Sequence, residues 1–223
     1  QGAGRTELAM SVFGKSYGND ITGSIEISGK KVHLSTPKEA IDHGMAYVTE
    51  DRKGNGLILS DSIAINTTMA RIKKICNKFG VIDIDKENNV AGEYVKKLNT
   101  KTPSVQQKLG NLSGGNQQKV LLSKWMFADS EILILDEPTR GIDVGAKYEI
   151  YCIINDLVAQ GKSVVMISSE MPELLGMCDR IYVMNNGEIV QESNAKDATQ
   201  ESIMKAILDS EKKEKADKET VAS

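Results

Sequence analysis

The sequence contains few of the side chains that build disulfide frameworks and transition-metal sites. Its three cysteines, Cys76, Cys152 and Cys178, lie far apart and form no C-x-x-C pair or other metal-binding spacing. This pattern indicates reduced thiols in a cytosolic protein rather than disulfides or zinc ligands. Histidine occurs only at His33 and His43, so a motif elsewhere in the chain that requires a histidine cannot be complete.

Long apolar runs and a strongly basic charge balance are also missing. No run approaches the roughly 18 apolar residues that a membrane-spanning helix needs, and the N-terminus has no signal-peptide pattern. The net charge is −3, which does not favour a nucleic-acid-binding protein. If a membrane matters to this protein, we expect it to act through a partner.

The chain that remains is long enough for one domain, or for one domain with an inserted lobe. It has 223 residues, of which 40% are hydrophobic and 26% charged, as in ordinary globular proteins. It opens at Gln1 within a glycine-rich stretch and without a methionine. We therefore expect a piece of a longer polypeptide.

Local patterns in the first 50 residues predict a hairpin, a helix and a strand. Apolar residues alternate on both sides of a Ser-Gly pair within 21–35, which predicts an antiparallel hairpin. The sequence Thr-Pro-Lys-Glu at 36–39 forms a capping box with proline at the first helical position, so a short helix should reach about residue 43. Residues 45–49 predict a short buried strand.

The middle of the chain predicts helices, and the part that follows predicts a βαβ unit. Residues 57–110 are rich in Lys, Asn and Asp, and Ser113 can cap a further helix. The apolar runs 132–135 and 163–167 are typical of strands that are buried on both faces. An amphipathic helix capped by Asp143 lies between them, so the two strands should be parallel with a right-handed crossover.

The last part of the chain predicts a hairpin and an unstructured tail. Asn186-Gly187 is the strongest short hairpin signal and lies between two apolar stretches. Residues 210–223 contain almost no apolar side chains, so we expect this tail to be disordered.

A glycine-rich motif begins the helix that follows residue 112. It reads Leu-Ser-Gly-Gly-Asn-Gln over 112–117. Ser113 and the two glycines would stand at a helix N-terminus, where free N–H groups and the positive end of the helix dipole attract anions. Alone, the motif could equally be an ordinary capped helix start.

Two adjacent carboxylates, Asp136 and Glu137, follow the first buried strand. They would emerge at its carboxyl end, where α/β sheets place their ligands. One carboxylate can hold Mg²⁺ through water, and the other can orient an attacking water. Alone, this stretch could be a strand that runs into a turn, but the order and spacing of the two motifs together leave little room for either plain interpretation.

Together these motifs resemble the ABC ATPase family. Residues 112–117 resemble its signature LSGGQ, with Asn116 in the last place of the motif. Residues 132–137 resemble Walker B with the catalytic glutamate, and 141–143 resemble the D-loop with Asp143. The resemblance covers nearly all of residues 2–190. It implies an α/β fold with a RecA-like P-loop ATPase core of mainly parallel strands, flanking helices, a small antiparallel β region and an inserted helical subdomain.

The exact residues of several motifs indicate a narrower group within this family. The stretches GAGRTE, TEDRK, NLSGGNQQK, DEPTRGIDVGAK and SSEMPE are similar to the second cassette of tandem-cassette ATPases that drive bacterial monosaccharide import. The family pattern implies a core lobe formed by 1–56 and 127–209, a helical and signature subdomain over 57–126, and the tail 210–223.

The N-terminal loop departs from the family pattern. Gly2, Gly4, Arg5 and Thr6 resemble the end of a Walker A loop, but Arg5 stands where the phosphate-binding lysine should be. Lysine is a compact charge and arginine a planar fork, so the exchange is not conservative. The resemblance implies that Thr6 and Asp136 hold Mg²⁺, although the fragment alone could be a plain glycine turn.

Two further positions depart from the pattern. Glu50 stands where a glutamine senses Mg²⁺ and faces the membrane partner, although a solvated acidic loop is the plain interpretation. Ser169 stands where a histidine contacts the γ-phosphate, and a helix cap before Pro172 is its more ordinary explanation. Asp136, Glu137 and the helix that carries the signature are intact.

The resemblance implies ATP and Mg²⁺ as cofactors, and a cassette that acts at the cytoplasmic face of the cell membrane. Its expected partners are a first cassette, transmembrane permease subunits and, indirectly, a periplasmic or extracellular sugar-binding protein, with no nucleic acid. Because ATP lies between two cassettes in this family, we expect this one to lend its signature to the partner site and to hydrolyse ATP slowly itself. Two alternatives stay open: a non-hydrolysing regulatory half, and an ABC ATPase without a transport role.

Overall fold

A parallel three-stranded sheet lies at the centre of the computed structural model, which describes residues 2–221. Its strands are β3 (Met45–Val48), β4 (Ile132–Asp136) and β5 (Ser163–Ile167), in the order β3-β4-β5. Both pairings are parallel. β4 has four buried residues out of five, as predicted for a strand covered on both faces, whereas β5 has no fully buried residue and Val165 is 52% exposed. The prediction that 163–167 is buried on both faces is therefore wrong, because one face of this edge strand is open. The predicted parallel pairing is confirmed.

Two antiparallel hairpins form separate sheets. Strand β1 (Ile25–Ile27) pairs with β2 (Lys30–Val32), and β6 (Arg180–Asn185) pairs with β7 (Glu188–Asn194). The turn between β6 and β7 places Asn186 at φ 47° and Gly187 at φ 82°. Positive φ at both central residues matches the twist of the flanking strands. Both predicted hairpins are confirmed.

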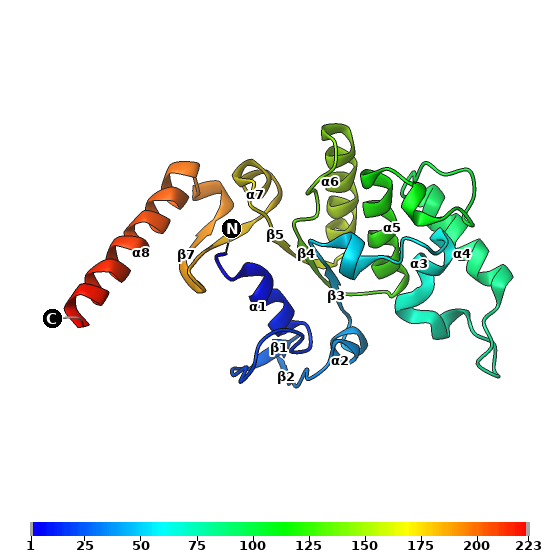
Figure 1. The fold of residues 1–223 in the computed structure, drawn as a ribbon, viewed down its shortest axis with the longest axis horizontal. Coiled ribbons are helices and arrows are strands. Elements are labelled where there is room, and N and C mark those ends of the chain that lie inside the picture. The colour runs from blue at the N-terminus through cyan, green and yellow to red at the C-terminus, as the bar shows by residue number, and fades with distance from the viewer. Residues whose placement is uncertain (1, 222–223) are drawn as a thin grey trace.

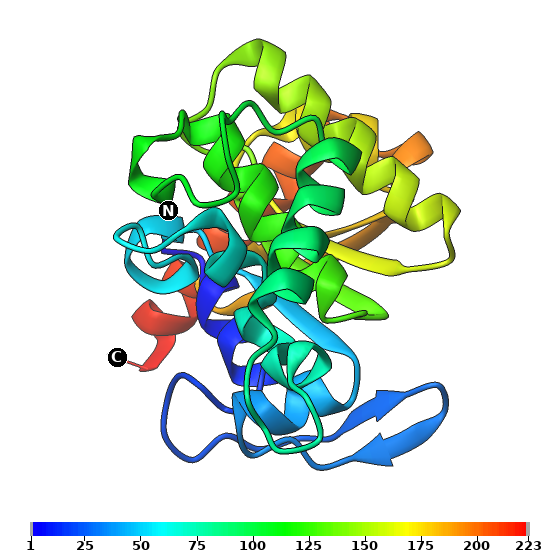
Figure 2. The same ribbon diagram turned by 90° about the vertical axis from the view of Figure 1, so that its right-hand side faces the viewer.

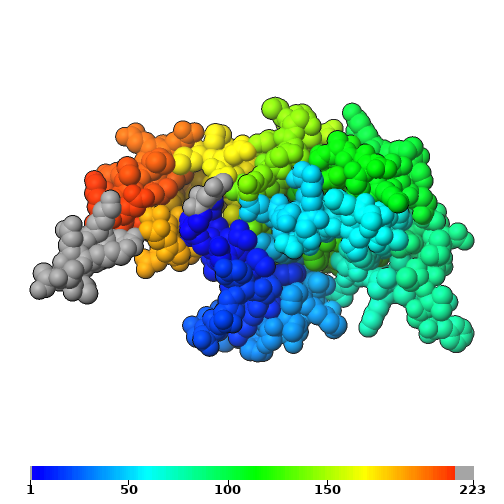
Figure 3. Space-filling view, viewed as in Figure 1, coloured from blue at the N-terminus to red at the C-terminus, as the bar shows by residue number. Residues whose placement is uncertain are grey.

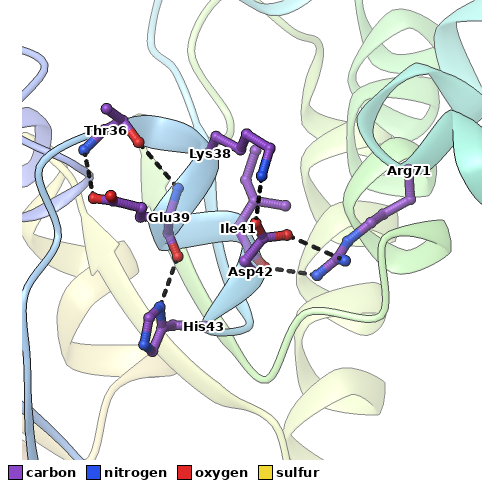
Figure 4. A network of polar contacts seen from close by, with 7 residues as sticks. All are labelled: Thr36, Lys38, Glu39, Ile41, Asp42, His43 and Arg71. Carbon is purple, nitrogen blue, oxygen red and sulfur yellow. Dashed lines mark hydrogen bonds and ion pairs between the residues drawn. The ribbon is translucent and has the colours of Figure 1, made fainter.

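The helix α2 (Pro37–Asp42) has the predicted capping box, which Figure 4 shows from close by. The hydroxyl of Thr36 accepts a hydrogen bond from the N–H of Glu39 at 3.3 Å, and the Glu39 carboxylate accepts from the N–H of Thr36 at 3.1 Å. From the helical region, Arg71 donates to the carbonyl of Ile41 at 2.8 Å. The end of α2 is thus tied to the middle of the chain (Figure 4).

Helices occupy the region between β3 and β4. They are α3 (Ile63–Thr68), the tight helical segment η2 (Met69–Ile75), α4 (Ile84–Lys97) and α5 (Gly114–Phe127). Figure 2 shows α4 and α5 side by side on one end of the molecule. The predicted helical character of this region is confirmed, whereas its division from the rest as a separate subdomain remains a prediction. Shorter helical turns are η1 (Arg52–Gly56), η3 (Leu109–Asn111) and η4 (Ala195–Asp197).

The remaining helices flank the strands. The first, α1 (Arg5–Val12), begins at the N-terminal glycine loop, and α6 (Val144–Ala159) connects β4 to β5. As predicted, Asp143 caps α6: its Oδ1 accepts a hydrogen bond from the N–H of Ala146 at 2.9 Å. The short helix α7 (Met171–Met177) follows β5 (Figure 1).

Two clusters of apolar side chains stabilise the fold. The larger one joins β3, β4, α5 and α6 and includes Trp125, Leu135 and Ile154. The smaller one lies between the β6–β7 hairpin and the helices beside it, and includes Ile181 and Ile203. In the space-filling view, the N-terminal residues lie between this C-terminal part and the segment that follows β3 (Figure 3).

The last helix corrects one prediction. Residues 210–223 were expected to be disordered, but α8 (Gln200–Val221) is helical throughout, and only residues 222–223 lie outside the described part. A lack of apolar side chains prevents a segment from joining a core, but it does not prevent a helix, because Lys, Glu and Ala have high helix propensity. Among the described residues, no helix has the length and apolar character needed to cross a bilayer.

Candidate functional site

A cavity of about 560 Å³ lies where α1 begins and where the loops after β3, β4 and β5 meet. Seven of the eight residues predicted for nucleotide binding and catalysis line it, although they come from four parts of the sequence. These seven residues are Gly2, Arg5, Thr6, Glu50, Asp136, Glu137 and Ser169. The other residues that line the cavity are Glu7, Arg140, Gly141, Ile167 and Glu170.

Asp136 ends β4 and is buried, with only 1% of its surface exposed. Its Oδ2 accepts a hydrogen bond from the Tyr47 hydroxyl at 2.9 Å, whereas its Oδ1 has no partner among the described residues. Burial, followed by the nearby charge of Asp136, raises the pKa of Tyr47. Tyr47 therefore remains a donor, and it fixes the carboxylate with one oxygen free.

The free oxygen of Asp136 fits a hard cation. A buried carboxylate oxygen without a donor is costly to leave unpaired, and Thr6 supplies a hydroxyl in the same cavity. The described residues contain no group of three His, Cys, Asp or Glu side chains that could hold a metal by itself. The Asp136 carboxylate and the Thr6 hydroxyl are oxygen ligands of the kind that Mg²⁺ takes, since Mg²⁺ usually has one or two protein ligands and completes its shell with water and phosphate.

Glu137 follows Asp136 in an unusual backbone conformation, with φ 47°. Its N–H donates to the carbonyl of Ile167 at 2.9 Å, which fixes the loop after β4 to the end of β5. The carboxylate faces Arg5, whose Nη2 lies 3.9 Å from Oε1. Arg5 also donates through Nη1 to the carbonyl of Ser168 at 2.7 Å. The guanidinium thus has internal partners within the cavity.

Glu50 is likewise engaged. Its carboxylate forms an ion pair with Arg140, which lies in the loop after β4. Sequence reasoning treated Glu50 either as a cofactor-facing group or as part of a solvated loop, and the structure shows a half-buried residue at the cavity edge with a cationic partner.

Ser169 does not cap a helix, contrary to its more ordinary explanation. The N-cap residue of α7 is Glu170, and its N–H donates to the hydroxyl of Ser168 at 3.0 Å, not to Ser169. The Ser168 hydroxyl donates in turn to Glu173, which is 5% exposed and also accepts from Thr139 at 2.8 Å. Because Ser168 takes the inward contacts, Ser169 stays exposed and lines the cavity.

Gly4 is the predicted site residue that does not line the cavity. It precedes α1 with φ 86°, and a Cβ atom there would lie 3.1 Å from Cα of Gly187. The N–H of Gly187 donates to the carbonyl of Ala3 at 3.0 Å. Gly4 is therefore required by close packing against the β6–β7 turn, in addition to any role in the loop.

The signature motif lies outside the cavity, at the start of α5. Ser113 is the N-cap residue, but its hydroxyl does not cap the helix and instead accepts from Nδ2 of Asn116 at 2.9 Å. Oδ1 of Asn116 accepts from the N–H of Lys101 at 2.9 Å. Ser113 is exposed at the start of α5, and the N-terminus of a helix favours anions through its dipole and its N–H groups.

The two signature glycines have packing reasons that the sequence did not reveal. A Cβ at Gly114 would lie 2.9 Å from Nη2 of Arg52, and a Cβ at Gly115 would lie 2.6 Å from Cβ of Ala146 in α6. Sequence reasoning assigned these glycines to the close approach of a phosphate. The structure shows that they allow α5 to approach α6 and the segment after β4.

The remaining signature residues support the loop. Gln117 is 4% exposed, and its Nε2 donates to the carbonyl of Leu112 at 3.0 Å. Leu112 packs against the larger apolar cluster. Asp143 is exposed beside this motif and caps α6. These contacts leave Ser113 and the first helical turn as the accessible part of the motif.

Sequence reasoning missed Tyr47 and Arg140 as partners of site carboxylates. Tyr47 lies in β3 and Asp136 in β4, 89 residues apart, so only the strand register brings them together. Arg140 lies within DEPTRG, between Glu137 and Asp143. A cation at that place beside an unusual acidic residue at position 50 was a signal that could have suggested the pair.

Comparison with known sequences shows the family. The sequence profile of ABC transporters matches residues 1–140. The chain is 59% identical over 206 residues to the L-arabinose transport ATP-binding protein AraG of Geobacillus stearothermophilus, covering 92% of this chain and 40% of that protein. It is 54% identical over 203 residues to the xylose import ATP-binding protein XylG of Geobacillus kaustophilus, covering 91% and 40%.

A third relative has a similar extent of match. The ribose import ATP-binding protein RbsA of Clostridium tetani is 50% identical over 204 residues, covering 92% of this chain and 40% of that protein. The chain therefore spans about 40% of the length of the curated relatives that it matches.

Solved structures show the same fold. The ADP conformation of an ATP-binding cassette of an ABC transporter superposes with a TM-score of 0.67 at 20% identity, covering 91% of this chain and 78% of that chain. A dimeric cassette bound to ADP and Pi gives a TM-score of 0.70 at 20% identity, covering 86% and 81%. The fold is thus an ABC ATPase cassette, α/β with a parallel sheet, small antiparallel sheets and flanking helices. With the profile match and these relatives, the chain belongs to the ABC transporter family.

Proposed function

We propose that this chain is an ATP-binding cassette half of a bacterial monosaccharide importer, in the position of the second cassette. It binds ATP at an interface with a first cassette, and hydrolysis there is coupled to sugar uptake. This half acts mainly by lending its signature, residues 112–117, to the site on its partner.

The observation that carries this proposal is the contrast between the cavity and the signature. In the cavity, Arg5 faces Glu137 and donates to the carbonyl of Ser168, and Glu50 pairs with Arg140. These groups must leave internal partners before they can meet a phosphate.

The signature end has no such competition. Ser113 is exposed at the first turn of α5, and its hydroxyl accepts only from Asn116 among the described residues. The N-terminus of this helix of 14 residues can therefore receive the phosphates of a nucleotide held by another cassette.

Phosphoryl transfer to water needs a positioned water and neutralised charge more than covalent chemistry. Glu137 is placed to orient that water, but Arg5 lies 3.9 Å from its carboxylate. Asp136 and Thr6 are the groups that would hold Mg²⁺, which neutralises phosphate charge when it is bound. Without a lysine at position 5 or a histidine at position 169, this cavity holds nucleotide and turns it over slowly.

The proposal includes the partners of the cassette. Transmembrane permease subunits would receive the motion of the helical and signature subdomain, 57–126, relative to the core lobe, 1–56 and 127–209. An extracellular sugar-binding protein would deliver the cargo, and the cassette would act at the cytoplasmic face of the membrane. The relatives with the names of arabinose, xylose and ribose transport proteins support this assignment.

The test compares one variant in each site within the assembled transporter. We expect Ser113→Arg to abolish ATP turnover and transport, because it blocks the helix end that meets the partner's nucleotide. Glu137→Gln should reduce turnover less than about twofold, since removing one of two unequal sites lowers the sum only slightly. A complete loss of turnover in Glu137→Gln, or normal transport by Ser113→Arg, would contradict the proposed division of labour.

A second candidate is a purely regulatory half that binds nucleotide without hydrolysing it. The contact between Arg5 and Glu137 favours it, since this contact involves the group that would activate water. ATPase activity of this chain, measured alone and then with a first cassette inactivated at its own catalytic glutamate, separates the two candidates. Turnover in the second assembly supports a slow enzyme, and none supports the regulatory half.

A further inference from the structure

The side chain of Arg52 crosses from the loop after β3 to the segment that follows β4. Its Nη1 donates to the carbonyl of Arg140 at 2.7 Å, and its Nη2 lies 3.4 Å from the carbonyl of Gly141. Its Nε is buried and has no hydrogen-bond partner among the described residues. The guanidinium therefore binds main-chain carbonyls of this segment rather than a carboxylate.

The loop that carries Arg52 holds the same segment a second time. Glu50 pairs with the side chain of Arg140, while Arg52 binds its carbonyl, so main chain and side chain are both fixed. Arg52 begins the helical turn η1, and Asp51 caps this turn: its Oδ1 accepts from the N–H of Gly54 at 3.0 Å. A short, capped turn can transmit a displacement of its residues to whatever they contact.

Arg52 also lies beside the signature. Its Nη2 lies 2.9 Å from where a Cβ of Gly114 would be, and the carbonyl of Gly141 lies 3.2 Å from the same position. Glycine at the first position of α5 therefore leaves room for a guanidinium and a carbonyl, and a larger residue would displace them.

We propose that Arg52 is a positioning residue that fixes the segment 140–143 against the first turn of α5. It joins the edge of the nucleotide cavity, at Glu50, to the two parts offered to a partner cassette, the signature and Asp143. A nucleotide that moves Glu50 in this cavity then moves the signature through Arg52. The effect on turnover rests on the function proposed above, whereas the contact itself does not.

The experiment uses Arg52→Ala, with Lys53→Ala as a matched control, because Lys53 is an exposed cation in the same loop. In the complete assembled protein, amide hydrogen exchange of segments 140–146 and 113–117 should become about tenfold faster in Arg52→Ala, as expected on loss of a charge-assisted hydrogen bond. Exchange in α4 and in the β6–β7 hairpin should stay unchanged. Lys53→Ala should leave all four regions unchanged.

A kinetic measurement separates positioning from general stability. Arg52→Ala should lower kcat for ATP about tenfold and change KM less than about twofold, because the variant misplaces the signature and the segment 140–143, which are needed at turnover. Arg52→Lys should recover part of kcat, since one ammonium can reach one of the two carbonyls.

The outcomes distinguish this inference from the proposed function. If Arg52→Ala exchanges like Lys53→Ala, or if exchange rises evenly along the chain, Arg52 does not position the segment and the inference is overturned. If the local exchange changes but Ser113→Arg retains full turnover, the proposed function fails and the contact stands. If the local exchange changes and kcat does not, the coupling of Arg52 to turnover is overturned.

Discussion

The nucleotide cavity and the signature helix use charged side chains in opposite ways. Charges of opposite sign line the cavity near one another: Nη2 of Arg5 lies 3.9 Å from Oε1 of Glu137, and the two side chains are 27% and 11% exposed. In α5, two lysines are buried instead. Lys119 is 2% exposed and Lys124 is 7% exposed. The first arrangement can exchange partners with a ligand, and the second cannot move without exposing or stranding a charge.

The buried lysines tie α5 to different parts of the fold. Lys119 pairs with Glu149 of α6 at 2.8 Å and donates to the carbonyl of Asn99 at 2.9 Å. Lys124 donates to the carbonyl of Gly56 at 2.7 Å. The helix that presents the signature is therefore held by rigid contacts along its length, while the cavity is adjustable. We therefore expect substitutions in α5 to lower the free energy of unfolding. Substitutions of charged side chains that line the cavity should leave this free energy nearly unchanged.

The largest expected effect concerns Lys124 and pH. Burial lowers its pKa to about 8 from the usual 10.5, so the unfolded chain binds the proton more tightly than the folded one. The burial penalty is complete below pH 8 and is relieved as the pH rises to 10.5, so the free energy of unfolding gains about 3 kcal/mol over this window.

Lys124→Met removes this contribution. Denaturant unfolding at intervals from pH 7 to 10.5 measures the difference between wild type and variant, in which other titrating groups cancel. The wild type should gain stability relative to Lys124→Met as the pH rises. A difference that is constant over the window would show that burial does not lower the pKa of Lys124, and the predicted pH dependence would be wrong.

The next largest effect comes from a comparison of two glycines, Gly115 in α5 and Gly92 in α4. Gly115→Ala places a methyl group 2.6 Å from Cβ of Ala146, whereas Gly92→Ala, within α4, meets nothing within 4 Å. We expect Gly115→Ala to lower the free energy of unfolding by about 2 kcal/mol through overpacking. Gly92→Ala should raise it by up to about 1 kcal/mol through helix propensity. Thermal or denaturant unfolding checks both, and effects of the same sign would contradict close packing between α5 and α6.

Thr139 tests whether the buried contacts next to the cavity residues, in the segment after β4, resemble those of α5. Its hydroxyl donates to the buried carboxylate of Glu173 at 2.8 Å, and Ser168 donates to the same carboxylate. Thr139→Val keeps the shape and removes one donor, so we expect a loss of about 1 to 2 kcal/mol in the free energy of unfolding. Thr102→Val, in an exposed turn, is the control. Equally small losses in Thr139→Val and Thr102→Val would show that the contact of Thr139 with Glu173 is no more rigid than a contact in an exposed turn.

The sequence predicts the local parts of this molecule better than the contacts between them. The capping box at Thr36, the cap at Asp143 and the turn at Asn186-Gly187 depend on neighbouring residues, and the structure confirms them. Seven predicted site residues line one cavity because parallel strands end at a common edge. The helical tail could not be predicted from a pattern of apolar residues, since the last part of α8 contains almost no apolar residues.

Partners that are distant in sequence could not be predicted. The contacts of Asp136 with Tyr47 and of Arg140 with Arg52 span 89 and 88 residues. Each depends on strand register and on the side-chain rotamer, neither of which leaves a periodic signal. The same limit concealed the packing role of the signature glycines, because glycine is equally suited to a phosphate and to a close neighbour.

The smallest effect should come from the cavity ion pair itself. Arg140→Ala removes the partner of Glu50 but leaves the main-chain carbonyl that Arg52 binds. The Arg140 side chain is 56% exposed, so solvent screens the pair and its loss should cost less than about 1 kcal/mol of unfolding free energy. Denaturant unfolding at low and high salt measures it, with Arg140→Lys as the charge-preserving control. A loss as large as that of Gly115→Ala would show that the cavity is built as rigidly as α5, and the contrast between the two regions would be wrong.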